Sequence, residues 1–366
     1  MHFTKTLIAA AVATGALGAA PLALAQVPAG YPASYQALVD GAKKEAKLVV
    51  YGATDSKAVQ PLVKDFNALY PNIVVEYNDM NSTEVYNRFI SESAAGGDTA
   101  DALWSSAMDL QMKLAAGGYA MAYKSVEASK IPGWASWKDM AYGTTFEPAA
   151  FVYNKRLVTG ADIPQTHADF VRIISQPKFQ DKVTTYDIEK SGVGFMFMTQ
   201  DEHDFAQFKQ LEQAFGAARV RVQSSTGTML ERISSGENLI GYNVLGSYAL
   251  VRAKTDPSLG VVLPKDYTLV ISRVLFINKS AKHPNAAKLW TDYLLSQRGQ
   301  TVIANASKLY AIRADVTGET TSTELIKLVG EKNIKPLPVS PAVAEYLDPA
   351  IRMAFLKEWK ASAGKK

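Results

Sequence analysis

Short apolar runs alternate with segments of helical spacing along the first third of the chain. This alternation constrains the fold more than any other feature of the sequence. The expected strands are 48–52, 73–77 and 101–104, and the expected helices are 33–47, 56–70, 82–95 and 108–116. Strands and helices that alternate at this distance favour parallel sheets covered by helices, the α/β class. Pro61 lies inside one expected helix and predicts a bend there.

Two later apolar runs are longer and richer in β-branched and aromatic residues. They span 144–154 and 267–278, and polar turns bound both of them. No Pro-, Gly- or Ser-rich linker divides the chain, so we expect two domains joined by strands at these runs. A chain that leaves one domain and later returns to it builds a hinged clamp of two discontinuous lobes.

The N-terminus has the three-part pattern of a secretory signal peptide. Lys5 supplies the positive start, an apolar stretch follows, and Ala23 and Ala25 provide the small residues before a cleavage site near Gln26. A membrane anchor is the alternative, but it needs about 20 strongly apolar residues. We therefore expect residues 1–25 to be removed and the mature protein to reside in the periplasm.

Composition excludes several classes of function. There is no cysteine, which rules out disulfides, thiolate zinc sites, Cys nucleophiles and a lipid anchor on a Cys. The net charge of +4 comes with no basic block interleaved with aromatics, so nucleic-acid binding is not expected. The remaining length of about 340 residues fits two domains.

Several short segments, in their order and spacing, resemble the type 2 periplasmic binding proteins of ABC importers. The resemblance is to the branch that contains ferric-ion-binding proteins and their sugar-phosphate and phosphonate relatives. The matching segments are 48–51, 101–106, 151–155, 189–192, 235–237, 283–287, 296–300 and 312–316.

The resemblance implies two α/β lobes, each a largely parallel sheet flanked by helices, joined by two β crossings. The expected N-terminal lobe comprises 27–147 plus 270–310, and the expected C-terminal lobe comprises 148–269 plus 311–366. The ligand would be held between the lobes, by loops at the strand ends.

The pattern of the iron-binding relatives is not preserved in this chain. Their His position falls on Asp55, their Glu position on Ser106, and their paired tyrosines on Gly246 and Ser247, although a one-residue gap brings Tyr248 into the pair. Ferric ion needs anionic oxygen ligands, and the four His show no metal-ligand spacing. We expect no metal and no cofactor.

Hydroxyl side chains at strand ends replace those ligands. Helix N-termini offer free N–H groups and partial positive charge to an anion, and hydroxyls add further donors. The same residues are preferred helix caps, and both roles are compatible. The expected ligand-binding residues are Thr54, Asp55, Ser105, Ser106, Ser191, Ser225, Thr226, Tyr242, Ser247 and Arg273.

Two charged residues in this set leave alternatives open. Arg273 lies in an apolar crossing, where it can pair with a ligand's phosphonate or carboxylate, or form a structural salt bridge with Glu147 or Asp55. Asp55 is either a plain helix cap or the acceptor of a ligand's ammonium group. In the second case the ligand is zwitterionic.

No catalytic motif supports an enzyme: the sequence has no G-x-S-x-G elbow, no P-loop and no G-x-G-x-x-G that opens a helix. We predict a monomeric solute-binding protein that captures a small anionic or zwitterionic solute by lobe closure and delivers it to an inner-membrane ABC permease. The alternatives are a ferric carrier that uses a synergistic anion and, from another class, a periplasmic hydrolase or transferase.

Overall fold

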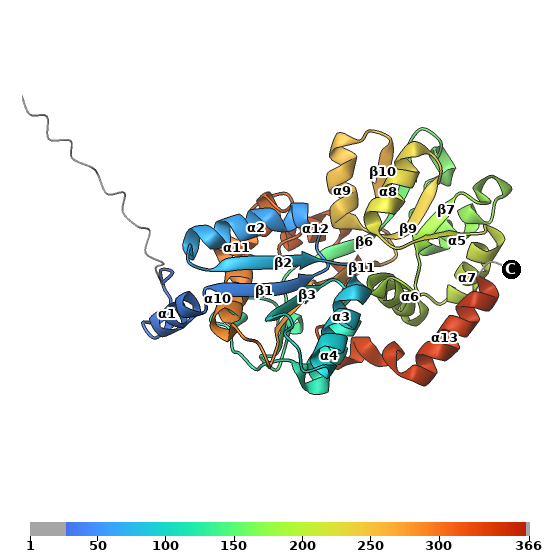
Figure 1. Ribbon diagram of the computed structural model, residues 1–366. Coiled ribbons are helices and arrows are strands. Elements are labelled where there is room, and N and C mark those ends of the chain that lie inside the picture. The colour runs from blue at the N-terminus through green and yellow to red at the C-terminus, as the bar shows by residue number, and fades with distance from the viewer. Residues whose placement is uncertain (1–26, 364–366) are drawn as a thin grey trace, which may run out of the picture.

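Two β-sheets, each covered by helices, form two lobes that lie side by side in the computed structural model, which describes residues 27–363 (Figure 1). The expected α/β class is confirmed. The expected signal peptide, residues 1–25, lies outside the described residues. Within 27–363, no helix has the length and apolar content needed to cross a bilayer.

The first sheet contains the strands that were expected from the N-terminal alternation. The pairs β1–β2 and β1–β3 at one side of the sheet are parallel, and β12 returns from late in the chain to pair antiparallel with β3 and β5. In order across the sheet the strands are β2 (Val74–Asp79), β1 (Lys47–Gly52), β3 (Ala102–Ser105), β12 (Val274–Ile277), β5 (Ala141–Gly143) and β4 (Ser136–Trp137).

The second sheet is built around β6, whose residues are almost all buried. β6 pairs antiparallel with β9 on one side, and with β10 and β11 one after the other on the other side. The strands are β13 (Ile334–Pro336), β11 (Thr268–Ile271), β6 (Glu147–Asn154), β9 (Ile240–Leu245), β7 (Val183–Tyr186) and β8 (Arg221–Gln223), with β10 (Leu259–Val262) beside β6.

The helices divide between the lobes in the same way as the strands (Figure 1). Around the first sheet lie α1 (Tyr35–Glu45), α2 (Ser56–Leu69), α3 (Ser82–Ala94), α4 (Met108–Leu114), α10 (Pro284–Leu295) and α11 (Gln297–Asn305). With the second sheet lie α5 (His167–Ile174), α6 (Gly192–Asp204), α7 (Phe208–Ala217), α8 (Thr226–Ser235), α9 (Gly246–Thr255), α12 (Ser322–Val329) and α13 (Pro349–Ser362).

The chain crosses between the sheets at two short breaks and passes to the second sheet once more on the long stretch between β12 and β13. The first break separates Gly143 of β5 from Glu147 of β6, and the second separates Ile271 of β11 from Val274 of β12. The expected crossing at 267–278 therefore contains two strands, one in either lobe, whereas the one at 144–154 contains β6 alone and begins just after β5. Both changes fall within a few residues of the domain boundaries expected from the sequence, which stay a prediction.

Apolar packing holds each lobe and also links the two. One cluster joins α1, α2 and α10 to the first sheet around Phe66 and Trp290, and another fills the second lobe around Phe151, Phe170 and Phe215. A third cluster contains Leu103 and Phe276 of the first sheet together with Val152 and Val244 of the second. The apolar core therefore continues from one lobe into the other.

The interior proline does not interrupt its helix. α2 is helical from Ser56 to Leu69 with Pro61 inside it. The helix buries Val59, Leu62 and Phe66 on one face, and this burial offsets the lost backbone hydrogen bond.

Candidate functional site

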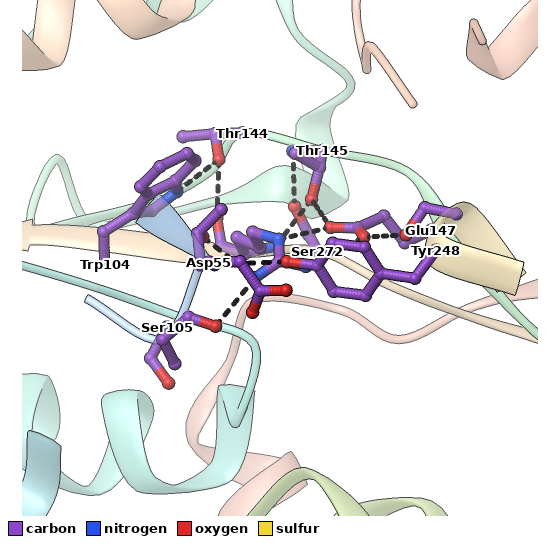
Figure 2. A network of polar contacts seen from close by, with 12 residues as sticks. Asp55, Trp104, Ser105, Thr144, Thr145, Glu147, Tyr248 and Ser272 are labelled. Carbon is purple, nitrogen blue, oxygen red and sulfur yellow. Dashed lines mark hydrogen bonds and ion pairs between the residues drawn. The ribbon is translucent and has the colours of Figure 1, made fainter. Parts of the chain in front are cut away.

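Arg273 and Glu147 form a buried ion pair at the hinge, where both crossings meet (Figure 2). Both side chains are fully buried. Arg273 Nε donates to Glu147 Oε1 at 2.7 Å, and Arg273 Nη2 donates to Glu147 Oε2 at 3.1 Å. This is the bidentate geometry that suits guanidinium and carboxylate groups.

Polar side chains of the two crossings complete this network. Thr145 donates through Oγ1 to Glu147 at 2.9 Å and accepts the Arg273 N–H at 2.8 Å. Thr144 donates to the Arg273 carbonyl at 2.8 Å and accepts from Trp104 Nε1 at 2.8 Å (Figure 2). The polar groups that interrupt the apolar run at 272–273 are therefore satisfied within the protein.

The pair also reaches a loop of the first lobe. Arg273 Nη1 donates to the Ala53 carbonyl at 3.1 Å and to Thr54 Oγ1 at 2.9 Å. Burial acts to lower the pKa of Arg273, but the Glu147 carboxylate holds it above its ordinary value. Of the alternatives left open for Arg273, the structure favours the structural salt bridge, with Glu147 and not Asp55 as the partner.

Asp55 and Tyr248 bring the two lobes together beside this pair. The Asp55 N–H donates to the Tyr248 hydroxyl at 3.3 Å, and the Tyr248 ring lies 5.4 Å from Arg273 Cζ. Asp55 precedes α2 but makes no side-chain capping bond, so its carboxylate is not used as a helix cap. Desolvation raises the pKa of Asp55 despite the opposing charge of Arg273, and burial raises the pKa of Tyr248 to about 12.

Ser105 and Ser106 are buried between β3 and α4. Ser105 Oγ accepts the Ala107 N–H at 3.2 Å. Within residues 27–363 the Ser106 hydroxyl makes no hydrogen bond to protein. A buried hydroxyl without a protein partner is available to a ligand.

In the second lobe, three expected residues lie at helix starts. Ser191 caps α6 by accepting the Gly194 N–H at 3.2 Å, and Ser225 caps α8 by accepting the Thr228 N–H at 3.2 Å. Thr226 shares a 2.5 Å hydrogen bond with the hydroxyl of Tyr186. The capping role considered from the sequence is therefore real for both serines. The Ser191 hydroxyl can still donate its own hydrogen, whereas the Ser225 hydroxyl also shares a 3.0 Å hydrogen bond with Thr228 Oγ1.

Two further expected residues serve the protein itself. Ser247 is fully buried and donates to Glu147 Oε2. Tyr242 is also fully buried, packs against Phe151 and Phe170, and donates to Asp201 Oδ2 at 3.0 Å. Because both hydroxyls are committed inside the protein, we leave Tyr242 and Ser247 out of the proposed ligand contacts.

Two further residues contact the expected site segments, although the sequence analysis did not propose them. Ser82 Oγ accepts the Val193 N–H at 3.3 Å and so ties α3 of one lobe to α6 of the other. The Tyr77 hydroxyl accepts the Thr54 N–H and donates to the Thr54 carbonyl, which fixes the loop after β1. Ser82 begins a helix expected from the sequence, which is a weak indication of a role at the site. No sequence pattern pointed to Tyr77.

Within the described range, no three His, Cys, Asp or Glu side chains gather into a group that could hold a metal ion. The positions that match iron ligands in the resembling family are occupied by Asp55, Ser106 and Ser247, with Tyr248 adjacent. Burial keeps Tyr248 a neutral phenol at pH 7. The site therefore offers N–H and O–H donors rather than a set of anionic ligands.

Comparison with known families and structures places the chain among transport proteins. Residues 98–335 match the model of the family described as bacterial extracellular solute-binding protein. No curated protein sequence was found to match the chain.

Three solved structures illustrate the likeness. The substrate binding protein of an ABC transporter from Agrobacterium tumefaciens is 39% identical, with a TM-score of 0.82, and the match covers 87% of this chain and 94% of that one. The periplasmic binding protein AfuA from Actinobacillus pleuropneumoniae, with fructose-6-phosphate bound, is 18% identical with a TM-score of 0.71 over 87% of this chain and 99% of its own. Iron-bound HitA from Pseudomonas aeruginosa is 16% identical with a TM-score of 0.69 over 86% and 99%. The two distant likenesses show the shared two-lobed fold alone.

Proposed function

The chain belongs to the family of bacterial extracellular solute-binding proteins, and we propose that it captures a small anionic or zwitterionic solute between its two lobes. It is the substrate-binding component of an ABC transporter, a class of protein that binds small solutes and works with a permease. The family and its structural neighbours are transporter proteins and not enzymes. Residence in the periplasm after cleavage near Gln26, and the monomeric state, stay predictions.

One observation carries the choice of site: the Asp55 N–H donates to the Tyr248 hydroxyl across the lobes at 3.3 Å. This contact brings the loop after β1 next to the start of α9. The proposed site also includes Ser106, whose hydroxyl has no protein partner within residues 27–363, and the capped starts of α6 and α8. A solute held here would touch both lobes and so favour the closed form.

The chemistry of these groups supports an anion-bearing solute. Ser106, Ser191 and Thr226 bring hydroxyls to helix starts, where free N–H groups and the helix dipole favour negative charge. Asp55 adds an acid to this place, and it is suited to an ammonium or hydroxyl group on the same solute. We therefore propose phosphate esters, phosphonates, carboxylates or amino acids as the class to test.

The test is a thermal-shift screen of sugar phosphates, phosphonates, carboxylates, polyols and amino acids, followed by calorimetry of any hit. Ser106→Ala should weaken the hit at least tenfold, because a hydrogen bond to a charged group contributes about 1.5–3 kcal/mol. The melting temperature of the unliganded protein should change little, since Ser106 Oγ has no protein partner to lose.

Ser307→Ala is the matched control. Ser307 is likewise buried with an unpaired hydroxyl, but it follows α11, away from the lobe interface. Equal affinity in the wild type and the Ser106→Ala variant would remove Ser106 from the site. Binding of ferric ion with a visible tyrosinate absorption band, and of no anion by itself, would replace the proposal with a ferric carrier.

A further inference from the structure

A cavity lies between the lobes, and neither Asp55 nor Tyr248 lines it. Its volume is about 210 Å³. Helices α3 and α4 of the first lobe form one wall, and α6, the turn at Leu347 and α13 of the second lobe form the other (Figure 1). The lining polar residues are Thr83, Asn87, Asp109, Lys113 and Arg352, with Tyr86 beside them.

The wall of this cavity includes a buried carboxylate without an ion-pair partner. Asp109 is only 2% exposed. Its Oδ1 accepts the Leu110 N–H at 2.8 Å, and within residues 27–363 no other side chain hydrogen-bonds to it or forms a salt bridge with it. A buried carboxylate in this state is costly, so it needs a functional or structural reason.

Two cations line the same cavity and are only partly used. Lys113 Nζ donates to the Leu347 carbonyl at 3.3 Å, which joins α4 to the second lobe. The Arg352 guanidinium carbon lies 4.3 Å from the centroid of the Phe195 ring, and within the described part of the chain the guanidinium makes no hydrogen bond. One small space therefore presents a negative group and two positive groups, with the neutral polar side chains of Thr83 and Asn87 beside them.

We propose that this cavity is a second binding site, for a small zwitterion of amino-acid size. The ammonium group of the solute binds Asp109, and its carboxylate binds Lys113 and Arg352. Since Asp109 and Lys113 belong to one lobe and Arg352 to the other, the bound zwitterion bridges them.

Because the bound zwitterion bridges the two lobes, its binding should affect ligand binding at the main site. A solute that contacts both lobes stabilises the closed form, and closure also favours the main ligand. The coupling is reciprocal, so each solute should raise the affinity for the other by the same factor.

The affinity of this cavity for a zwitterion should depend on pH. Burial raises the pKa of Asp109 to about 7, against the opposing charges of Arg352 and Lys113. Burial also raises the pKa of Tyr86, which stays neutral. An ammonium group binds the ionised form of Asp109, so binding releases a proton and tightens as the pH rises towards the pKa of Asp109.

The experiment is isothermal titration calorimetry of the full mature chain with glycine, L-alanine and L-serine, and with methylamine and acetate as single-charge probes. In Ser106→Ala, which weakens the main site, we expect a zwitterion to bind with one-to-one stoichiometry and more tightly than either single-charge probe. Asp109→Asn and Lys113→Met should each weaken it at least tenfold. The affinity should rise severalfold between about pH 6 and pH 8 in the wild type but not in Asp109→Asn.

Ser106→Ala separates the two sites, because it should leave this binding unchanged. Loss of zwitterion binding in Ser106→Ala, with retention in Asp109→Asn, would mean that the solute occupies the main site and would overturn the proposal. Absence of any heat with all three amino acids would also overturn it and leave a water-filled cavity. Anion binding at the main site is measured in Asp109→Asn, so failure of either site is seen independently of the other.

Discussion

At the scale of single residues, the buried acids of this protein differ in how their charge is compensated. Glu147 is paired with Arg273 and also accepts from Thr145 and Ser247. Asp109 has one backbone N–H as its partner, at the start of α4. The charge of Asp109 is therefore the less compensated of the two, although both side chains are buried.

Asp109 should lower stability as the pH rises. Its folded pKa is about 7, whereas its unfolded pKa is about 3.9. Below about pH 4 the group is protonated in both states and has no effect, and between about pH 4 and pH 7 only the unfolded state loses the proton. The cost should approach a few kcal/mol above about pH 7, at about 1.4 kcal/mol for each pKa unit.

Urea denaturation of the wild type and Asp109→Asn across this range checks the sign. The asparagine can still accept the Leu110 N–H but carries no charge, so the variant should be more stable than the wild type at about pH 8 and equal to it near pH 4. A difference that is the same at every pH would show that the charge of Asp109 is not the cause.

At the scale of elements, the ion pair explains how four strands meet at the hinge. Glu147 begins β6, and Arg273 lies in the break between β11 and β12, close to the end of β5. Through Thr54 the same guanidinium holds the loop between β1 and α2. The pair thus fixes the place where both crossings change sheets.

Removing one partner should be far more harmful than removing both charges. Arg273→Met leaves Glu147 buried and unpaired, and we expect a loss of about 3–5 kcal/mol in the free energy of unfolding. Adding Glu147→Gln should recover about 1 kcal/mol or more, because the amide removes the uncompensated charge. Urea denaturation of the two singles and the double completes the cycle. Strictly additive losses would show that the two charges are not coupled in the folded state.

The sequence predicted the elements better than it predicted the site. The apolar runs at 48–52 and 101–104 became β1 and β3, because buried parallel strands need uninterrupted apolar residues. The break at 272–273 was missed, since its polar residues are satisfied only by distant partners such as Thr145. Tyr242 shows the same limit: the sequence placed it among the expected ligand-binding residues, but packing against Phe151 places it in the core.

The cavity at Asp109 lay beyond sequence analysis for a similar reason. Asp109 by itself has the pattern of an acid in the first turn of a helix, which is common. The other side of its cavity comes from α13, which lies far along the chain and brings Arg352 to the same space. Only the packing of the two lobes creates this combination.

At the scale of the whole molecule, closure depends on how tightly the start of α6 fits against the first lobe. A Cβ added at Gly192 would lie 2.6 Å from Leu110 Cδ1, 3.1 Å from Ala107 Cβ and 3.2 Å from Ser82 Oγ, all of them across the lobe interface. The leucine tip can rotate away, but the contact with Ala107 is relieved only by moving the lobes apart. Gly192→Ala should therefore oppose the closed form selectively, because an open form has no such contact.

Overpacking of this kind costs about 1–3 kcal/mol, which corresponds to a loss of roughly five- to 150-fold in affinity for a solute that binds the closed form. Calorimetry with the solute found in the screen gives the affinity, and solution scattering of the liganded protein gives the degree of closure. Gly133→Ala is the control, since a Cβ there meets no atom within 4 Å. If Gly192→Ala bound as tightly as the wild type and reached the same liganded radius, α6 would not approach the first lobe in the bound form. The Ser191 hydroxyl would then be too far from Ser106 to share one solute with it.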